Sequence, residues 1–116
     1  MSSAPASPLL FTVLGKWSQV IEVTVDRWTK HIIARHPELA NREDLVKEAI
    51  RNPEIVYEGD TADDKMFRSA KVPGSGFVLG GKVIIAVVNY TGTAKLITAY
   101  STTLDPKRRV LWIRPP

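Results

Sequence analysis

The chain holds two histidines, His31 and His36, and they are its clearest candidates for moving protons. A histidine titrates near neutral pH, so it can serve as a general acid or base. Residues five apart lie roughly 140° apart around an α-helix, so both can face one site only if the helix ends between them. Pro37 favours that end, because the residue before a proline is pushed away from helical angles. The alternative for each is a structural histidine, partly buried or stabilised at a helix C-terminus by the dipole.

Other side chains are suited to holding a phosphate group. Arg68 lies in the middle of an expected strand, and a guanidinium can bind a phosphate through two hydrogen bonds at once. Thr98 and Tyr100 alternate along a later expected strand, so their hydroxyls share one face with Leu96 and can donate to a phosphate oxygen. The alternative is an ordinary surface arginine, and hydroxyl residues that occur there because strands favour Thr and Tyr.

The charge of the chain favours a polyanionic partner. Lys and Arg outnumber Asp and Glu by 16 to 12, which gives a net charge of +4. A basic balance of this kind attracts polyanions such as nucleic acids. Near the C-terminus, Lys107, Arg108, Arg109 and Arg114 could follow a polyanion backbone. The same charges could instead protect an exposed strand edge from pairing with another strand.

No metal and no cofactor are expected. The chain has no cysteine and lacks the His-Glu-x-x-His spacing, so its two histidines do not indicate a metal site. It also lacks the P-loop, the dinucleotide-binding glycine motif and the nucleophile elbow. The missing cysteine also excludes a disulfide framework and a cysteine nucleophile, and it is compatible with a reducing cytoplasm.

The length of 116 residues predicts one domain. Residues 1–15, with Pro, Ser and Ala at the start, are expected to form a flexible leader before a single domain at 16–116. The start lacks the basic residues of a signal peptide, and the apolar run at 9–14 is too short to span a bilayer. We therefore expect a cytoplasmic protein without a membrane segment.

The elements that would position these groups are two helices followed by a meander of strands. The first helix is expected to begin at Thr24 or Asp26 and to end near His36, and the second to run from an N-cap at Asn41 to Pro53. Extended segments are expected at 19–25, 54–58, 66–72, 77–79, 83–88, 94–101 and 110–113. This order predicts an α+β fold, with two N-terminal helices packed on one face of a roughly four-stranded antiparallel sheet.

An ordered set of motifs over about residues 20–102 resembles one known group of proteins. The set is Trp28, His31-Ile32, Arg35-His36-Pro37-Glu38-Leu39, Val46, Ile50-Arg51-Asn52-Pro53-Glu54, Phe67-Arg68, Val83-Ile84-Ile85 and Leu96-Ile97-Thr98-Ala99-Tyr100. It is similar to the phage-associated branch of the barnase–EndoU–colicin–RelE (BECR) nuclease-like superfamily. The fold of that family, N-terminal helices on a four-stranded antiparallel sheet, agrees with the fold expected from the pattern of elements.

The resemblance implies RNA cleavage without a metal. A base takes the proton of a ribose 2′-hydroxyl, which attacks the adjacent phosphate, and an acid protonates the leaving 5′-oxygen. By this resemblance His31 or His36 would be the base or the acid, Arg68 would hold the phosphate, and Thr98 and Tyr100 would donate hydrogen bonds. Arg35 would assist at the RNA, as would the basic residues Lys107, Arg108 and Arg109.

The resemblance also implies a toxin-like enzyme with RNA as its partner and an immunity or antitoxin protein as another. A shared fold does not establish an activity. The alternative is therefore a non-catalytic module that kept the fold and binds RNA or a protein. A third interpretation is a domain whose ligand is a small anion. The distance between the histidines and Arg68 is the observation expected to separate the first two interpretations.

Overall fold

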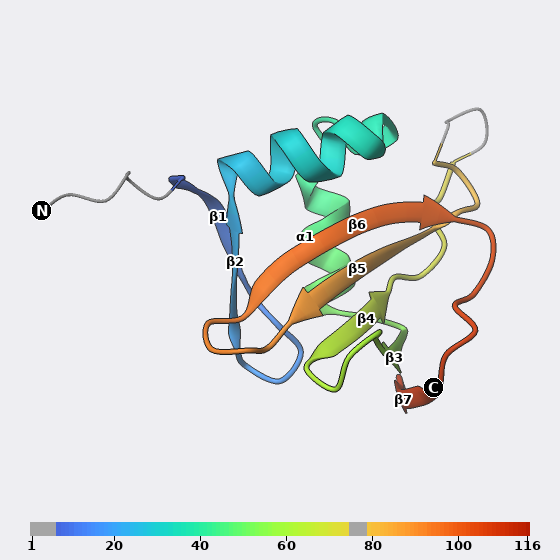
Figure 1. The fold of residues 1–116 in the computed structure, drawn as a ribbon. Helices are drawn as coiled ribbons and strands as arrows, with labels where there is room; N and C mark the ends of the chain where they lie inside the picture. The colour runs from blue at the N-terminus through green and yellow to red at the C-terminus, as the bar shows by residue number, and fades with distance from the viewer. Residues whose placement is uncertain (1–6, 75–78) are drawn as a thin grey trace, which may run out of the picture.

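The computed structural model describes residues 7–74 and 79–116. Within these ranges the chain forms seven strands, two helices and one short 3₁₀ turn (Figure 1). In chain order they are β1 (Leu9–Leu14), β2 (Val20–Thr24), the π-helix η1 (Arg27–Ile33), the 3₁₀ turn η2 (Pro37–Leu39), the α-helix α1 (Glu43–Arg51), β3 (Ile55–Glu58), β4 (Asp64–Arg68), β5 (Val83–Asn89), β6 (Lys95–Thr102) and β7 (Val110–Ile113). The extended segment expected at 77–79 lies mostly outside the described residues.

The strands form one mixed sheet in the order β1-β2-β6-β5-β4-β3-β7. Neighbouring strands are antiparallel except β2 and β6, which are parallel and share the single register pair Glu22 and Lys95. The fold is therefore α+β, but the expected four-stranded antiparallel sheet preceded by two helices is wrong. The described residues begin with a β-hairpin of β1 and β2, and that hairpin extends the sheet beyond β6.

The strand β1 occupies part of the expected leader. Phe11 and Val13 point toward the core from alternate positions of β1, and the strand pairs with β2 along its length. The turn after β1 also docks, because Trp17 packs on Phe67 with ring centroids 5.9 Å apart. The alternation of apolar residues in β1 outweighs the Pro and Ser content before it. Residues 1–6 of the expected leader lie outside the described residues.

The hydrophobic core lies between α1 and one face of the sheet. Val46, Ala49 and Ile50 are the buried stripe of α1, as their helical spacing predicts. They face the alternate core residues Ile84 and Ala86 of β5, and Figure 1 shows α1 behind the strands. The expected N-cap at Asn41 is wrong. That residue adopts a positive φ of 62° in the turn before α1, and the helix begins two residues later.

The helix η1 lies along β6 and covers its outer edge, at the top of Figure 1. Trp28 and Ile32 are buried in the core and fix the helix to the molecule. The helix ends before His36, whose φ of −132° and ψ of 67° are not helical, so the end expected from Pro37 is confirmed. Its i→i+5 hydrogen bonds differ from the expected α-helix, and such π-helical stretches are often found at functional sites.

Candidate functional site

The outer edge of β6 is covered by side chains of the helical segments in place of a strand. β2 pairs with β6 only at Lys95, which leaves the rest of this edge without a neighbouring strand in the described part of the chain. Arg27 donates a hydrogen bond from Nη1 to the carbonyl oxygen of Ile97, at 3.4 Å. At the other end of the edge, the carboxylate of Glu38 accepts a hydrogen bond from the hydroxyl of Ser101 at 3.0 Å. These two contacts hold η1 and η2 against β6.

A β-bulge in β6 decides which side chains face outward. Val87 of β5 pairs with Thr98, and Val88 pairs with Leu96, so Ile97 is an extra residue. Leu96 and Ala99 are therefore both buried in the core, and Thr98 and Tyr100 lie on the opposite face. The expectation that Thr98 and Tyr100 share a face with Leu96 is wrong, because simple alternation does not hold across a bulge.

An open cavity of about 470 Å³ lies between η1 and the outward face of β6. We call it the histidine groove. Its lining residues are Arg27, His31, Arg35, His36, Ile97, Thr98 and Tyr100. Arg27, His31 and Arg35 are four residues apart, so they form one stripe along the helix. His36 joins them because the helix has ended and the chain turns back toward β6. Both predicted histidines thus meet Thr98, Tyr100 and Arg35 in one place.

His36 sits between an aromatic ring and a carboxylate. Its ring centroid lies 5.7 Å from that of Tyr100, and its Nδ1 lies 4.0 Å from Oε2 of Glu38. Partial burial acts to raise the pKa of Glu38. Hydrogen bonds from its own backbone and from Ser101, together with the charge of His36, outweigh that effect and lower the pKa below its usual value. Glu38 therefore stays ionised at neutral pH and can orient the His36 ring.

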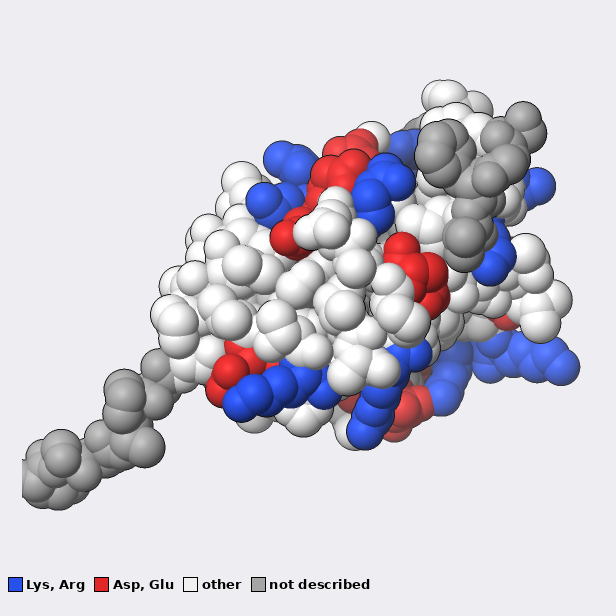
Figure 2. All heavy atoms as spheres, turned by 90° about the horizontal axis from the view of Figure 1, so that it is seen from above, with Lys and Arg blue, Asp and Glu red and all other residues white. Residues whose placement is uncertain are grey.

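The remaining groups of the histidine groove supply positive charge and one neutral donor. Burial is the main cause that raises the pKa of Tyr100, so its hydroxyl keeps its proton at neutral pH. His31 and Arg35 are exposed, and neither Arg27 nor Arg35 has an ion-pair partner among the described residues. The groove is therefore suited to an anionic ligand. Figure 2 shows the molecule from the helix side, where basic side chains lie beside acidic ones over this face.

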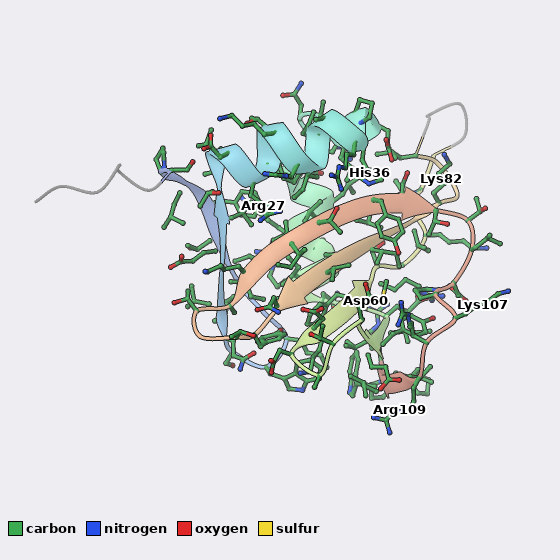
Figure 3. All side chains as sticks on the ribbon, in the orientation of Figure 1. Arg27, His36, Asp60, Lys82, Lys107 and Arg109 are labelled. Atoms are coloured by element: carbon green, nitrogen blue, oxygen red, sulfur yellow. The ribbon has the colours of Figure 1, made fainter. Side chains whose placement is uncertain are left out.

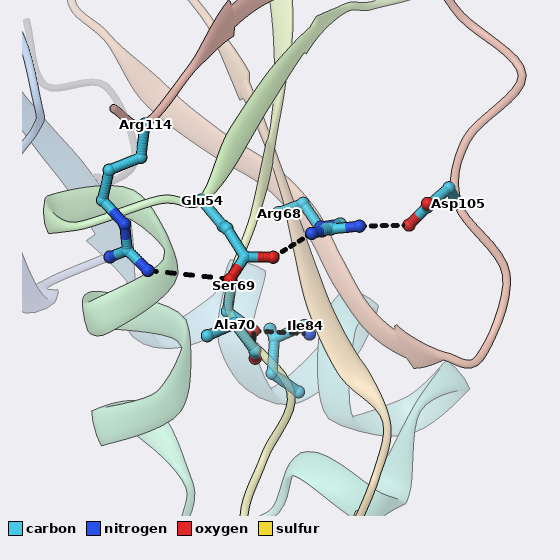
Figure 4. A network of polar contacts seen from close by, with 7 residues as sticks. All are labelled: Glu54, Arg68, Ser69, Ala70, Ile84, Asp105 and Arg114. Carbon is cyan, nitrogen blue, oxygen red and sulfur yellow. Dashed lines mark hydrogen bonds and ion pairs between the residues drawn. The ribbon is translucent and has the colours of Figure 1, made fainter. Parts of the chain in front are cut away.

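Arg68 does not line the histidine groove. Arg68 of β4 and Tyr100 of β6 both pair with Ile85 of β5, which lies between them. Their side chains therefore lie on the same face of the sheet. The guanidinium of Arg68 is instead held by two carboxylates: it pairs with Glu54 and donates from Nη1 to Asp105 at 2.6 Å (Figure 4). Both outer nitrogens are therefore occupied, and the predicted phosphate contact would require these pairs to open.

A wider network surrounds Arg68. Glu54 also pairs with Arg114 at 3.6 Å, so the network joins β4 to the end of the chain. The Nε of Arg68 is buried and has no hydrogen-bond partner in the described part of the chain. Burial acts to lower the pKa of Arg68, but the hydrogen bond and charge of Asp105 and the charge of Glu54 raise it above its usual value. The arrangement is that of a structural ion-pair network.

The basic residues of the C-terminal region do not line the histidine groove, although Arg108 is near enough to Tyr100 for its charge to act to lower the pKa of that hydroxyl. Arg108 pairs with Asp60, and Arg109 pairs with Glu58 at 3.2 Å. Lys107 is exposed, and Figure 3 places it and Arg109 away from His36. These acidic partners neutralise much of the positive charge that was expected to attract a polyanion. Sequence reasoning missed Arg27 as a groove residue, although its position four residues before His31 is a signal for it.

Neither a metal site, nor a membrane span, nor a known relative assigns a function to this groove within the described residues. Among the described residues, no group of three or more His, Cys, Asp or Glu could hold a metal ion. None of the helices in the described ranges combines the length and apolar character that crossing a bilayer requires. No protein-family model, curated protein or solved structure matches the chain.

Proposed function

We propose that the histidine groove binds the phosphodiester backbone of RNA and cleaves it by attack of the ribose 2′-hydroxyl. The observation that carries this proposal is the groove itself, in which His31, His36, Thr98 and Tyr100 meet between η1 and β6. Two imidazoles can supply a base and an acid at neutral pH, and the reaction needs both. Membership of the BECR superfamily, a toxin-like role with an immunity protein and a cytoplasmic location belong to this proposal as predictions.

The groups of the groove can divide the reaction among them. One histidine takes the proton of the 2′-hydroxyl, whose oxygen bonds to phosphorus, and the other gives a proton to the 5′-oxygen as its bond to phosphorus breaks. His36 is held by Glu38 and Tyr100, whereas His31 is exposed and can follow a substrate. Arg27 lies where it can offset negative charge on the phosphate. Products would be a 2′,3′-cyclic phosphate and a free 5′-hydroxyl.

Cleavage of single-stranded and structured RNA by the purified protein, with chelator present, tests the proposal. His31→Ala and His36→Ala should each lower the rate by about 10²- to 10⁴-fold, the usual range for loss of a general acid or base. Lys30→Ala is the matched control, because Lys30 is exposed beside His31 and does not line the groove. Intact RNA at high protein concentration would refute the proposal, and equal rates for all three variants would refute the assignment of the histidines.

A non-catalytic RNA-binding module is the second candidate. It is favoured by the position of Arg68, because the guanidinium expected to hold the phosphate is bound by Glu54 and Asp105 instead. Such a module would bind RNA in the groove, and its affinity would fall with salt as counterions are released. Salt-dependent binding that Arg35→Ala weakens, without any 2′,3′-cyclic phosphate product, would favour this candidate over the enzyme.

A further inference from the structure

A second cavity adjoins the histidine groove along the edge of β6. Its volume is about 410 Å³, and it lies where the β1–β2 hairpin meets β6. Arg27 and Ile97 line both cavities, so the two are neighbours on either side of the β-bulge. Along β6, Lys95 and Tyr100 are separated by roughly 17 Å at about 3.3 Å per residue. The two cavities together therefore suit a short stretch of an extended polymer.

The second cavity, which we call the Glu22 pocket, differs in chemistry from the histidine groove. Leu9 and Ile97 give it apolar walls, and Glu22 and Thr24 supply oxygen atoms. Glu22 and Thr24 point to this side because the alternate residues of β2, Ile21 and Val23, are buried in the core. A pocket with apolar walls and a few polar atoms is typical of a site for a small organic group.

The carboxylate of Glu22 is available to a ligand. It has no ion pair or side-chain hydrogen bond within the residues that the structure describes, although its register partner Lys95 lines the same pocket. A carboxylate accepts hydrogen bonds and cannot donate them. It therefore favours a ring that presents N–H groups and repels one that presents only lone pairs.

We propose that the Glu22 pocket holds a base of the RNA strand next to the phosphate in the histidine groove, and that Glu22 selects bases with an amino group. This inference rests on the proposed function. Adenine, cytosine and guanine carry an exocyclic amine that can donate to Glu22, whereas uracil carries two carbonyl oxygens around a single N–H. Leu9 and Ile97 contact the faces of the ring, and Lys95 and Arg27 are placed to meet phosphates on either side.

Binding of short oligonucleotides that cannot be cleaved tests the pocket apart from catalysis. The probes are fluorescent 2′-O-methyl pentamers of adenosine, cytidine and uridine, titrated with the protein and followed by anisotropy. The wild-type protein should bind the adenosine and cytidine pentamers at least about fivefold more tightly than the uridine pentamer, a modest value for one base contact. Glu22→Gln should lose this preference, because an amide both donates and accepts.

Two further variants separate base selection from charge. Glu43→Gln makes the same change of charge on α1, outside the Glu22 pocket and the histidine groove, and should keep the preference. Lys95→Gln should weaken all three pentamers by a similar factor, because a phosphate contact carries no base preference. Thermal unfolding of each variant confirms that the comparison is made on folded protein.

The outcomes distinguish this inference from the proposed function. Equal affinity of the wild-type protein for the three pentamers, or a preference that Glu22→Gln leaves unchanged, overturns the inference. If RNA is cleaved but the pentamers show no preference, cleavage stands and the Glu22 pocket does not. If the pentamers bind with the expected preference and RNA stays intact, the pocket stands and the catalytic proposal falls.

Discussion

Replacement of Arg68 by methionine is expected to destabilise the fold and to leave the histidine groove intact. The side chain of Arg68 is only 13% exposed and bridges Glu54 and Asp105, which come from the segment before β3 and the loop after β6. Methionine keeps much of the volume and removes the charge. The variant therefore removes the ion pairs without opening a large cavity.

The size of the expected loss in unfolding free energy depends on how exposed Glu54 and Asp105 are. Loss of a hydrogen bond to a charged group costs about 1.5–3 kcal/mol when the partner left behind is buried. Glu54 is 37% exposed and Asp105 is 58% exposed, so water replaces part of each lost contact. We expect a net loss of about 2 kcal/mol for the two contacts together. For a chain of 116 residues this corresponds to a fall in Tm of about 8 °C.

Urea unfolding and calorimetry measure this loss, and a double-mutant cycle assigns it. Asp105→Asn alone should be milder, because Asp105 is the more exposed partner. Combined with Arg68→Met it should add little, since the contact is then already gone. His31→Ala is the control for stability, because that side chain is exposed and its loss should leave Tm nearly unchanged.

The result that would refute this prediction is an Arg68→Met variant with unchanged stability and lost RNA cleavage or binding. If Arg68→Met unfolds at the wild-type temperature but no longer cleaves or binds RNA, the ion pairs contribute little and Arg68 acts on the ligand. In that case the Glu54 and Asp105 contacts open when RNA binds, as the sequence-based expectation for Arg68 requires.

Two predictions concern pH. The folded pKa of Glu38 lies below its usual value of 4.5, so the stability that Glu38 contributes is fully present above that value and is lost as pH falls through the lower folded pKa. Urea unfolding at about pH 3–6 should show a difference in unfolding free energy between the wild-type protein and Glu38→Gln that narrows toward the acid end, and a constant difference would contradict the assignment. Burial raises the pKa of Tyr90 to about 12, so the protein should lose stability as pH rises from the usual tyrosine value of 10 through 12, and Tyr90→Phe should remove the last phase of the phenolate absorbance titration.

The sequence predicts the local elements of this fold better than their assembly. The apolar stripe Val46, Ala49 and Ile50 indicates α1, and the run at 83–88 indicates β5, because each follows from spacing along a few neighbouring residues. The mixed sheet could not be predicted in this way. It depends on the parallel contact between Glu22 and Lys95, which are far apart in the chain and carry no local signal for each other.

In the candidate site, too, the residues could be predicted from the sequence but their long-range contacts could not. His31, His36, Thr98 and Tyr100 were expected from their chemistry, and the structure brings them together in one groove. The bulge at Ile97 that sets the outward face was not predictable from alternation. The pairing of Arg68 was not predictable either, because Asp105 approaches it from a loop 37 residues away along the chain.

The parallel seam between β2 and β6 has a consequence for how the protein folds. The strands β3 to β6 follow one another along the chain and can pair early, whereas the β1–β2 hairpin reaches β6 only after most of the chain has been brought together. Contacts between residues far apart in sequence close a long loop and form late. The Glu22 pocket borders this seam, because Glu22 and Lys95 both line it. A chain emerging from the ribosome would therefore complete its antiparallel meander before it completes the Glu22 pocket.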